Sequence, residues 1–161
     1  MLRVLTVLAC LAPLPALALS CLPHGVTDAY LEAAAAEEGY VPVLGEIAFD
    51  PDLLPQVDWD KQQDVPPTTL IPATFKGDAV SVRGVALPFE TDVVLEVQCI
   101  GPWCPQPQPG RSIAFLRKTA HSYVLSTNAC GGFLFGNPNA EQVKEVEDCL
   151  AGRACRPWAE R

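Results

Sequence analysis

The stretch SIAFLRKTAHSYVLSTNAC, residues 112–130, decides the fold class of this 161-residue chain. Both of its halves, residues 112–119 and 122–130, are rich in the aliphatic, aromatic and β-branched residues that favour strands. Ala120 and His121 link the two halves, so the spacing predicts a tight β-hairpin.

Three stretches upstream predict further strands. Residues 40–49 (YVPVLGEIAF) contain β-branched and aromatic residues around Gly45, which is typical of a bend or a bulge. Residues 70–82 (LIPATFKGDAVSV) predict a second strand. In residues 93–98 (VVLEVQ) every second side chain is apolar and faces one side, which indicates a half-buried strand. Together with the hairpin, these segments make about five strands.

Helical patterns flank the strands. Thr27 or Asp28 can cap a helix that runs to about Glu38, and its alanine run favours helix while offering little bulk to bury. We therefore expect a spacer helix lying across the domain. Residues 137–150 predict a second helix, with Asn137 as its N-cap and a proline in its first turn.

The order of these elements defines the expected architecture. Strands and helices do not alternate, which argues against a parallel sheet. A mainly β domain with flanking helices, built as a small OB-like antiparallel barrel stabilised by disulfides, fits this order best. We expect residues 21–161 to form this single domain, with a long loop rich in proline and aspartate at about residues 50–67.

The first twenty residues predict an export signal. Arg3 precedes an apolar run that is too short and wrongly flanked for a membrane-spanning helix, and no later stretch is long enough. Small residues favour cleavage after Ala18 or after Ser20, and the second site makes Cys21 the N-terminus. We therefore expect an exported protein, periplasmic or extracellular, that lacks residues 1–20 in its mature form. A lipid anchor on Cys21 is the alternative, although the residues before it do not match a lipoprotein signal.

The cysteines that follow the signal are even in number, which in an exported chain predicts up to three disulfides. They are Cys21, Cys99, Cys104, Cys130, Cys149 and Cys155. Gly152 permits a short loop between Cys149 and Cys155, which are therefore the expected local pair. Cys21 then pairs either with the Cys99/Cys104 region or with Cys130. The paired CxxC spacing of a zinc cluster is absent from the sequence, so we expect no metal.

The charge of the chain excludes some partners. Its formal net charge is -8 at pH 7 and its pI is about 4.6, so it repels nucleic-acid backbones and anionic membranes. Asp58, Asp60 and Asp64 match three positions of a calcium-binding loop. Gln63 and Thr69 replace its glycine and its closing glutamate, so we expect a solvated acidic loop and no cofactor.

The candidate catalytic residues are few. His24 follows Cys21 by three residues, a spacing that suggests a cysteine nucleophile with a histidine base, but we expect this histidine to face solvent. Cys99 and Cys104 are separated by four residues, whereas a thioredoxin-type site has two, so a structural disulfide is expected. We therefore do not expect an enzyme. Trp59 in the long loop either anchors a partner or folds back over the barrel.

The layout resembles the netrin-like modules, whose best-known members are the tissue inhibitors of metalloproteinases. The resemblance covers about residues 21–150 and is carried by Cys21 with Pro23-His24 after it, by the strand at 40–49 and by the hairpin FLRKTAHSYVLSTNAC. It implies an OB-fold barrel with flanking helices pinned by disulfides. In those inhibitors the N-terminal cysteine chelates the zinc of the protease through its amine and carbonyl, while its sulfur sits in a disulfide. Only Cys21 matches that role here.

These observations favour an exported, non-catalytic binding module of unknown partner. Its candidate binding residues are Cys21, Leu22 and Trp59, and the partner that the resemblance implies is a metalloprotease bound through Cys21. Two alternatives stay open. One is an envelope enzyme or thiol redox protein, and the other is a lipid-anchored structural protein of the envelope.

Overall fold

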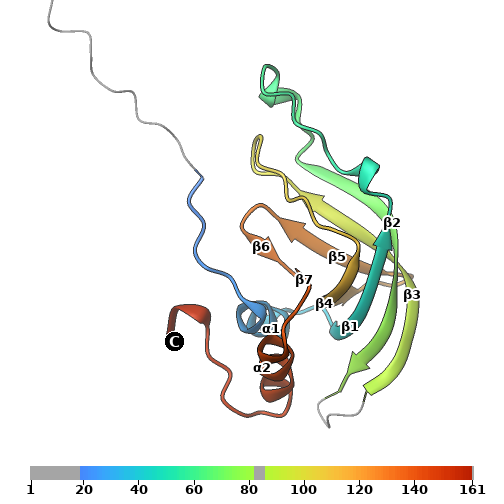
Figure 1. Cartoon of the computed structure of the whole chain (residues 1–161), viewed down its shortest axis with the longest axis vertical. Coiled ribbons are helices and arrows are strands. Elements are labelled where there is room, and N and C mark those ends of the chain that lie inside the picture. Colours follow the sequence, from blue (N-terminus) through green and yellow to red (C-terminus); the bar gives the residue numbers. More distant parts are fainter. Residues whose placement is uncertain (1–18, 82–85, 161) are drawn as a thin grey trace, which may run out of the picture.

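The computed structural model describes residues 19–81 and 86–160 of the chain (Figure 1). The expected signal peptide, residues 1–20, therefore lies almost entirely outside the described residues. The helices are α1 (Val26–Ala35) and α2 (Ala140–Leu150). The strands are β1 (Tyr40–Phe49), β2 (Thr68–Val80), β3 (Ala86–Gln98), β4 (Gly110–Lys118), β5 (Tyr123–Asn128), β6 (Gly131–Gly132) and β7 (Leu134–Gly136). Short 3-10 turns occur at η1 (Pro51–Leu53), η2 (Gln62–Asp64) and η3 (Trp158–Glu160).

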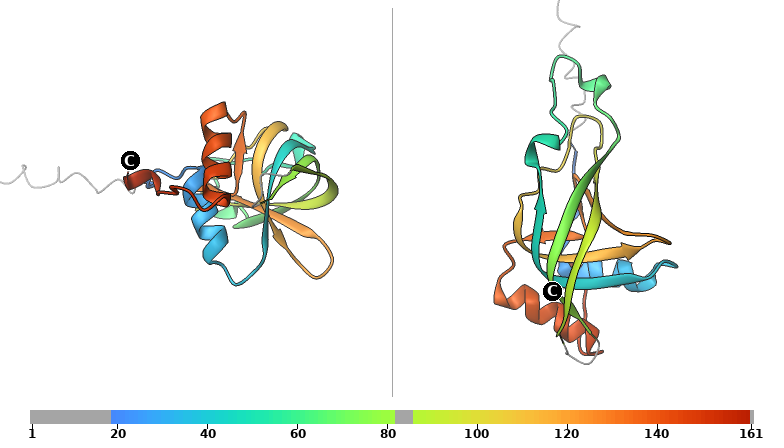
Figure 2. Two further views of the ribbon diagram at one scale, coloured as in Figure 1. Left: turned by 90° about the horizontal axis from the view of Figure 1, so that it is seen from below. Right: turned by 90° about the vertical axis from the view of Figure 1, so that its right-hand side faces the viewer.

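Five strands close into an OB-like barrel in the order β1-β2-β3-β5-β4, and β4 pairs back onto β1 (Figures 1 and 2). The pairs β1–β2, β2–β3, β1–β4 and β4–β5 are antiparallel, as expected. The closing pair β3–β5 is parallel, which the sequence-based expectation of an antiparallel barrel missed. The reason is geometric: β5 pairs with β4 at only two positions after the hairpin turn and then runs alongside β3 toward the same end.

A close approach of two backbones explains the glycine expected to mark a bend in the first strand. Gly45 on β1 lies opposite Gly77 on β2. A Cβ at Gly45 would lie 2.2 Å from the carbonyl oxygen of Lys76, and one at Gly77 would lie 2.3 Å from that of Leu44. Side chains at either position would therefore push the two strands apart, and only glycine permits this contact.

The core fills the barrel with the inward-facing residues of its strands. On β3 the residues Val93, Leu95 and Val97 are buried, which confirms the alternation expected there. The largest fully buried side chains are Phe75 and Phe115. Helix α1 adds three small side chains to the same core, namely Val26, Ala29 and Ala33. Because these side chains are short, α1 packs closely against the barrel and lies beside α2 (Figure 2).

Helix α1 is shorter than expected at its C-terminus and begins slightly earlier. Its N-cap is Gly25, whose backbone N–H donates to the Asp28 carboxylate at 2.8 Å. Thr27 and Asp28, the expected caps, both lie inside the first turn. Asp28 thus supports the helix start from the third helical position, where its negative charge also interacts favourably with the positive end of the helix dipole.

The N-cap of helix α2 lies two residues later than expected. Asn137 adopts a left-handed backbone with φ of 49° and does not cap the helix. The cap is Asn139, whose carboxamide oxygen accepts from the backbone N–H of Gln142 at 2.8 Å. The Gln142 side chain accepts from the Asn139 N–H in return at 3.0 Å, completing a capping box.

Three disulfides pin the fold, and they involve all six cysteines that follow the expected signal. Cys149 pairs with Cys155, as expected. Cys21 pairs with Cys130, which selects one of the two alternatives left open by the sequence, and Cys99 pairs locally with Cys104. Such a framework indicates a non-cytoplasmic, oxidising environment. None of the described helices has the length and apolarity needed to cross a membrane.

Candidate functional site

The N-terminal segment is fastened to the far end of the expected hairpin. The disulfide joins Cys21 to Cys130, which lies in the turn between β5 and β6 and is 109 residues away in the chain. Cys21 itself is exposed, and Leu22 beside it is 87% exposed. The sulfur of Cys21 is thus bonded within the fold, while the residue as a whole remains exposed.

The expectation that His24 faces solvent is wrong. Its ring nitrogen Nε2 lies 3.0 Å from the carbonyl oxygen of Gly132, and its ring stacks on Phe135 with a centroid separation of 6.1 Å. A Cβ at Gly131 would lie 2.6 Å from the imidazole, so glycine at this position leaves room for the ring. His24 therefore anchors the N-terminal segment against β6 and β7. It has no thiol beside it to activate, because Cys21 is oxidised.

The structure separates the expected binding residues into two places. Cys21 and Leu22 lie on the segment that runs down the side of the barrel to α1 (Figure 1, blue). Trp59 lies in the β1–β2 loop, which projects from the upper end of the barrel, and is 62% exposed. Of the two possibilities for Trp59, the structure shows the exposed one.

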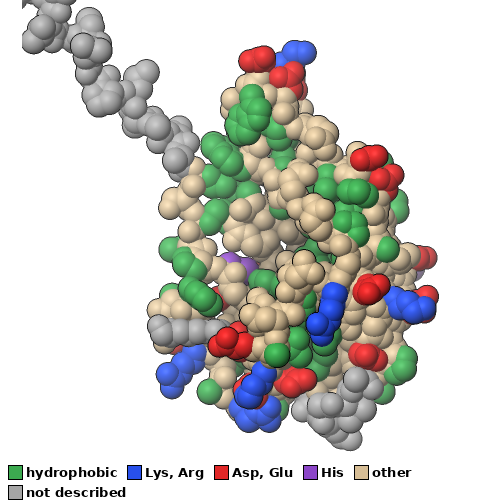
Figure 3. Space-filling view, viewed as in Figure 1, with side chains coloured by type: hydrophobic (Ala, Val, Ile, Leu, Met, Phe, Trp, Pro, Cys, Tyr) green, Lys and Arg blue, Asp and Glu red, His purple; other side chains and the backbone are tan. Residues whose placement is uncertain are grey.

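Large exposed hydrophobic side chains gather at this upper end, a feature that the sequence reasoning missed apart from Trp59. Eight such side chains occur among the described residues, and five of them belong to the β1–β2 loop, the β3–β4 loop or the start of β2. We call these five residues the apical surface: Leu53, Trp59, Leu70, Ile100 and Trp103. Figure 3 shows hydrophobic side chains over the upper loops, with carboxylates beside them.

Hydrogen bonds and a disulfide hold the loops of the apical surface in place. The Gln106 side chain of the β3–β4 loop donates to the carbonyl oxygen of Pro55 in the β1–β2 loop at 3.2 Å. The Cys99–Cys104 disulfide closes a turn in which Ile100 and Trp103 exchange backbone hydrogen bonds of 2.9 and 3.2 Å. The side chains at the centre of this short disulfide-closed loop remain exposed. The close spacing of the two cysteines is therefore the sequence signal that could have identified Ile100 and Trp103 as exposed residues.

The long loop beside these side chains is strongly acidic. Its aspartates are all exposed, and Lys61 is the basic residue that the loop carries among them. They are Asp50, Asp52, Asp58, Asp60 and Asp64. Asp50 and Asp58 accept from the backbone N–H groups two residues on, at 3.0 and 2.9 Å, and so shape the loop. Across residues 19–81 and 86–160, no three His, Cys, Asp or Glu side chains are arranged to hold a metal.

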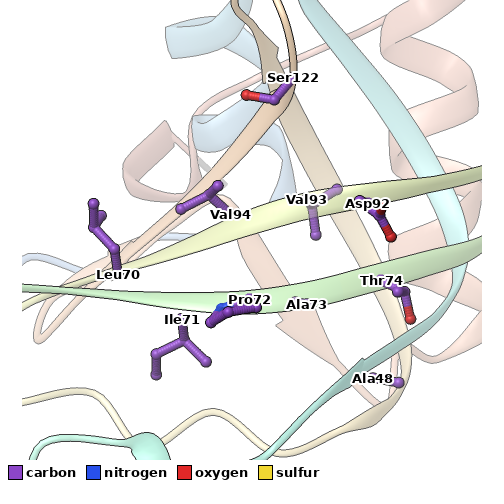
Figure 4. A pocket seen from close by; sticks show the side chains of 10 residues that line it. All are labelled: Ala48, Leu70, Ile71, Pro72, Ala73, Thr74, Asp92, Val93, Val94 and Ser122. Atoms are coloured by element: carbon purple, nitrogen blue, oxygen red, sulfur yellow. The ribbon is translucent and has the colours of Figure 1, made fainter.

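A groove on the outer face of β2 and β3 is a second candidate surface. It has a volume of about 640 Å³. Figure 4 shows Leu70, Pro72 and Val94 at one end, Ala48, Thr74 and Asp92 at the other, and Ser122 of the β4–β5 turn above them. OB-fold barrels commonly bind their ligands on this face. An adjoining depression of about 550 Å³ shares Ala48, Thr74 and Asp92 with it and extends it toward Glu46 and Glu90.

Comparisons with protein-family models, with curated proteins and with solved structures find no match for this chain. The class that the fold itself defines is a small disulfide-stabilised OB-like barrel. Its candidate surfaces are the apical surface, the groove on β2 and β3, and the exposed N-terminal segment at Cys21 and Leu22.

Proposed function

We propose that the protein is an exported, non-catalytic binding module that docks another protein through the apical surface. The observation that carries this proposal is the concentration of large exposed hydrophobic side chains on two loops tied to each other at one end of the barrel. Exposed apolar clusters on soluble proteins mark interaction sites. Tryptophan is over-represented among the residues that dominate binding energy, so Trp59 and Trp103 are the expected anchors.

The charge of the β1–β2 loop specifies the chemistry of the partner. Five aspartates and one lysine give residues 50–67 a formal charge of -4. Lys61 forms a salt bridge with Asp58 at 4.0 Å, so the other four aspartates of the loop are left without a cation from the loop itself. A partner surface with an apolar pocket and a rim of lysine and arginine complements this arrangement, and the opposite charges would accelerate encounter.

The scaffold suits such a role because it fixes the loops without catalytic groups among them. Binding loops generally sit on a rigid framework, here a closed barrel and three disulfides. The disulfides also support the export that the N-terminal sequence predicts. The Cys21 sulfur that a lipid anchor or a Cys-His nucleophile would need is bonded to Cys130, so both alternatives require a different state of this cysteine.

Matched variants test the proposal against the exported proteins of the source cell. Trp59→Ala and Leu70→Ala remove side chains that are 62% and 63% exposed on the apical surface. Trp158→Ala and Leu87→Ala remove side chains that are 51% and 56% exposed elsewhere. A partner captured by the wild type should bind the two apical variants about tenfold or more weakly. It should bind the two controls as tightly as the wild type, and equal losses in both pairs would contradict the proposal.

A second candidate function is inhibition of a zinc endopeptidase through Cys21. The observation in its favour is that Cys21 is exposed with its sulfur already in a disulfide, so cleavage before it would free an amine on an exposed residue, next to the exposed Leu22. Two forms of the protein, one beginning at Cys21 and one retaining Leu19-Ser20, should be assayed against a panel of zinc endopeptidases. Only the form beginning at Cys21 should inhibit. Inhibition by neither form, or equally by both, would reject this candidate.

A further inference from the structure

We propose that the groove on β2 and β3, together with the adjoining depression that reaches β1, binds an extended segment of the partner protein. In this segment an aliphatic residue is followed, two and four residues on, by lysine or arginine. The proposal rests on the proposed function, because it assigns to the same partner a second contact. It names the chemistry that this contact recognises.

The strand register orders the outward-facing side chains of the groove in three rows. Pro72 and Val94 are paired in the first row, and Leu70 lies two residues before Pro72 on β2, opposite Glu96. Thr74 lies between Ala48 and Asp92 in the second row. Lys76 lies between Glu46 and Glu90 in the third row. The groove is thus apolar in its first row and becomes polar and acidic over the next two.

The acidic rows of the groove hold more carboxylates than cations. Lys76 forms a salt bridge with Glu90 at 3.1 Å. The carboxylates of Asp92 and Glu46 form no salt bridge within the described part of the chain, although Arg111 of β4 lies opposite Glu46 in the strand register. The three carboxylates and one lysine that line this half of the groove carry a formal charge of -2, which Arg111 beside Glu46 reduces to -1. A cationic group is therefore the complementary ligand here, and a phosphate backbone is disfavoured.

The spacing of the rows matches an extended polypeptide. Successive rows are two strand residues apart, which corresponds to about 6.7 Å. In an extended peptide, side chains that share a face are also two residues apart and have the same spacing. An aliphatic side chain on the Pro72 and Val94 row would therefore place the next two side chains of that face beside Asp92 and then over the third row, between the carboxylates of Glu46 and Glu90.

The position of the groove connects it to the apical surface. Leu70 belongs to the apical surface and also lines the apolar end of the groove. A partner anchored at the loops can therefore continue into the groove without leaving contact with the protein. This continuity favours a segment of the same partner over an unrelated small ligand.

Three synthetic peptides test the proposal on the isolated wild-type protein, followed by NMR at low ionic strength. The first carries the sequence Leu-Ser-Lys-Ser-Lys, the second Leu-Ser-Glu-Ser-Glu and the third Ser-Ser-Lys-Ser-Lys, all with blocked ends. The first should shift the resonances of Ala48, Thr74 and Val94, with a weak affinity in the millimolar range. The second and third should bind more weakly, because each lacks one half of the match.

Two groove variants and one control locate the charge contact. Asp92→Asn and Glu46→Gln should each weaken binding of the lysine peptide by about threefold, since both carboxylates are exposed to solvent. Glu141→Gln on α2 should leave the affinity unchanged. Equal binding of the lysine and glutamate peptides would overturn the proposal. So would unchanged affinity in both groove variants, or no groove shifts at about 5 mM peptide. Because no partner is used, these failures would leave the Trp59 test of the proposed function intact.

Discussion

The bridge between Cys21 and Cys130 should stabilise the fold far more than either of the two local disulfides. The three disulfides close loops of very different length, with sequence separations of 109, 5 and 6 residues. Replacing each pair of cysteines by serines gives three double variants that lose one bridge each. The comparison among the three variants isolates the effect of loop length on the free energy of unfolding, since the same chemical change is made three times.

The magnitude follows from the entropy of loop closure in the unfolded chain. For a separation of 109 residues the expected loss in the free energy of unfolding is about 4.8 kcal/mol. For separations of 5 and 6 residues the expected loss is about 2 kcal/mol each. The difference of almost 3 kcal/mol is large against a typical domain stability of about 5–15 kcal/mol.

The long bridge also has native contacts that should keep the variant folded. His24 contacts Gly132 and Phe135 and holds the same segment next to the same turn. Cys21→Ser/Cys130→Ser should therefore unfold cooperatively, but at a lower denaturant concentration. We expect the loss to appear as a lower midpoint with a similar or larger denaturant slope, because the unfolded chain becomes more expanded.

Guanidinium chloride unfolding followed by far-UV circular dichroism measures all three variants under one condition. The long-bridge variant should lose more than twice the free energy of unfolding lost by either local variant. Equal losses in the three variants, or a loss below about 1 kcal/mol for the long bridge, would refute the loop-closure reasoning.

Three further predictions use matched substitutions. Gly77→Ala should lose about 3 kcal/mol of unfolding free energy in chemical denaturation, because its Cβ would meet backbone atoms within 3 Å. Gly136→Ala, whose Cβ would meet no atom within 4 Å, should change little, and similar losses would contradict the packing argument. His24→Ala should lose about 2 kcal/mol through its hydrogen bond and ring stacking, while the exposed His121→Ala should be neutral in the same assay. Hydrogen bonds from Lys144 and Arg153 hold the pKa of Asp148 below its ordinary value of 3.8, so the midpoint of its NMR titration should lie below that value. The stabilisation from Asp148 is then present above pH 3.8 and lost as the pH falls through the folded-state pKa, and a midpoint at or above 3.8 would disprove it.

Local patterns in the sequence identified most of the strands. The bounds of β1 coincide with the expected stretch, residues 40–49. Strand β2 begins at Thr68 instead of residue 70, because Thr68 and Thr69 still pair with the end of β3. The alternation on β3 and the hairpin after β4 were also correct, since both depend on neighbouring residues along the chain.

The errors arise where distant residues decide the outcome. The parallel pairing of β3 with β5 depends on how far the hairpin diverges, and no local pattern records this. His24 is half-buried because Gly131 and Phe135, more than a hundred residues later, make room for its ring and stack on it. The N-cap of α2 was misplaced for a local reason, because helix propensity does not distinguish Asn137 from Asn139. Asn137 adopts a left-handed backbone, which leaves Asn139 as the cap.

The candidate surfaces were predictable only in part. The sequence singled out Trp59 but could not decide between exposure and burial, because that depends on where the long loop goes. Leu53 and Leu70 read as ordinary apolar residues of a loop and a strand. Alternation indicates which strand residues face outward, whereas the curvature that turns this face into a groove comes from barrel closure.

Site-specific photo-cross-linking in the producing cell tests the central claim most directly. A photoreactive residue would be placed at Trp59 and Trp103 on the apical surface, and at Trp158 and Leu87 as exposed controls. Docking through the apical surface predicts that both apical positions form a covalent adduct with the same protein and that the two control positions do not. Adducts at the control positions alone, or no adduct at any position, would contradict the claim that this surface binds a protein.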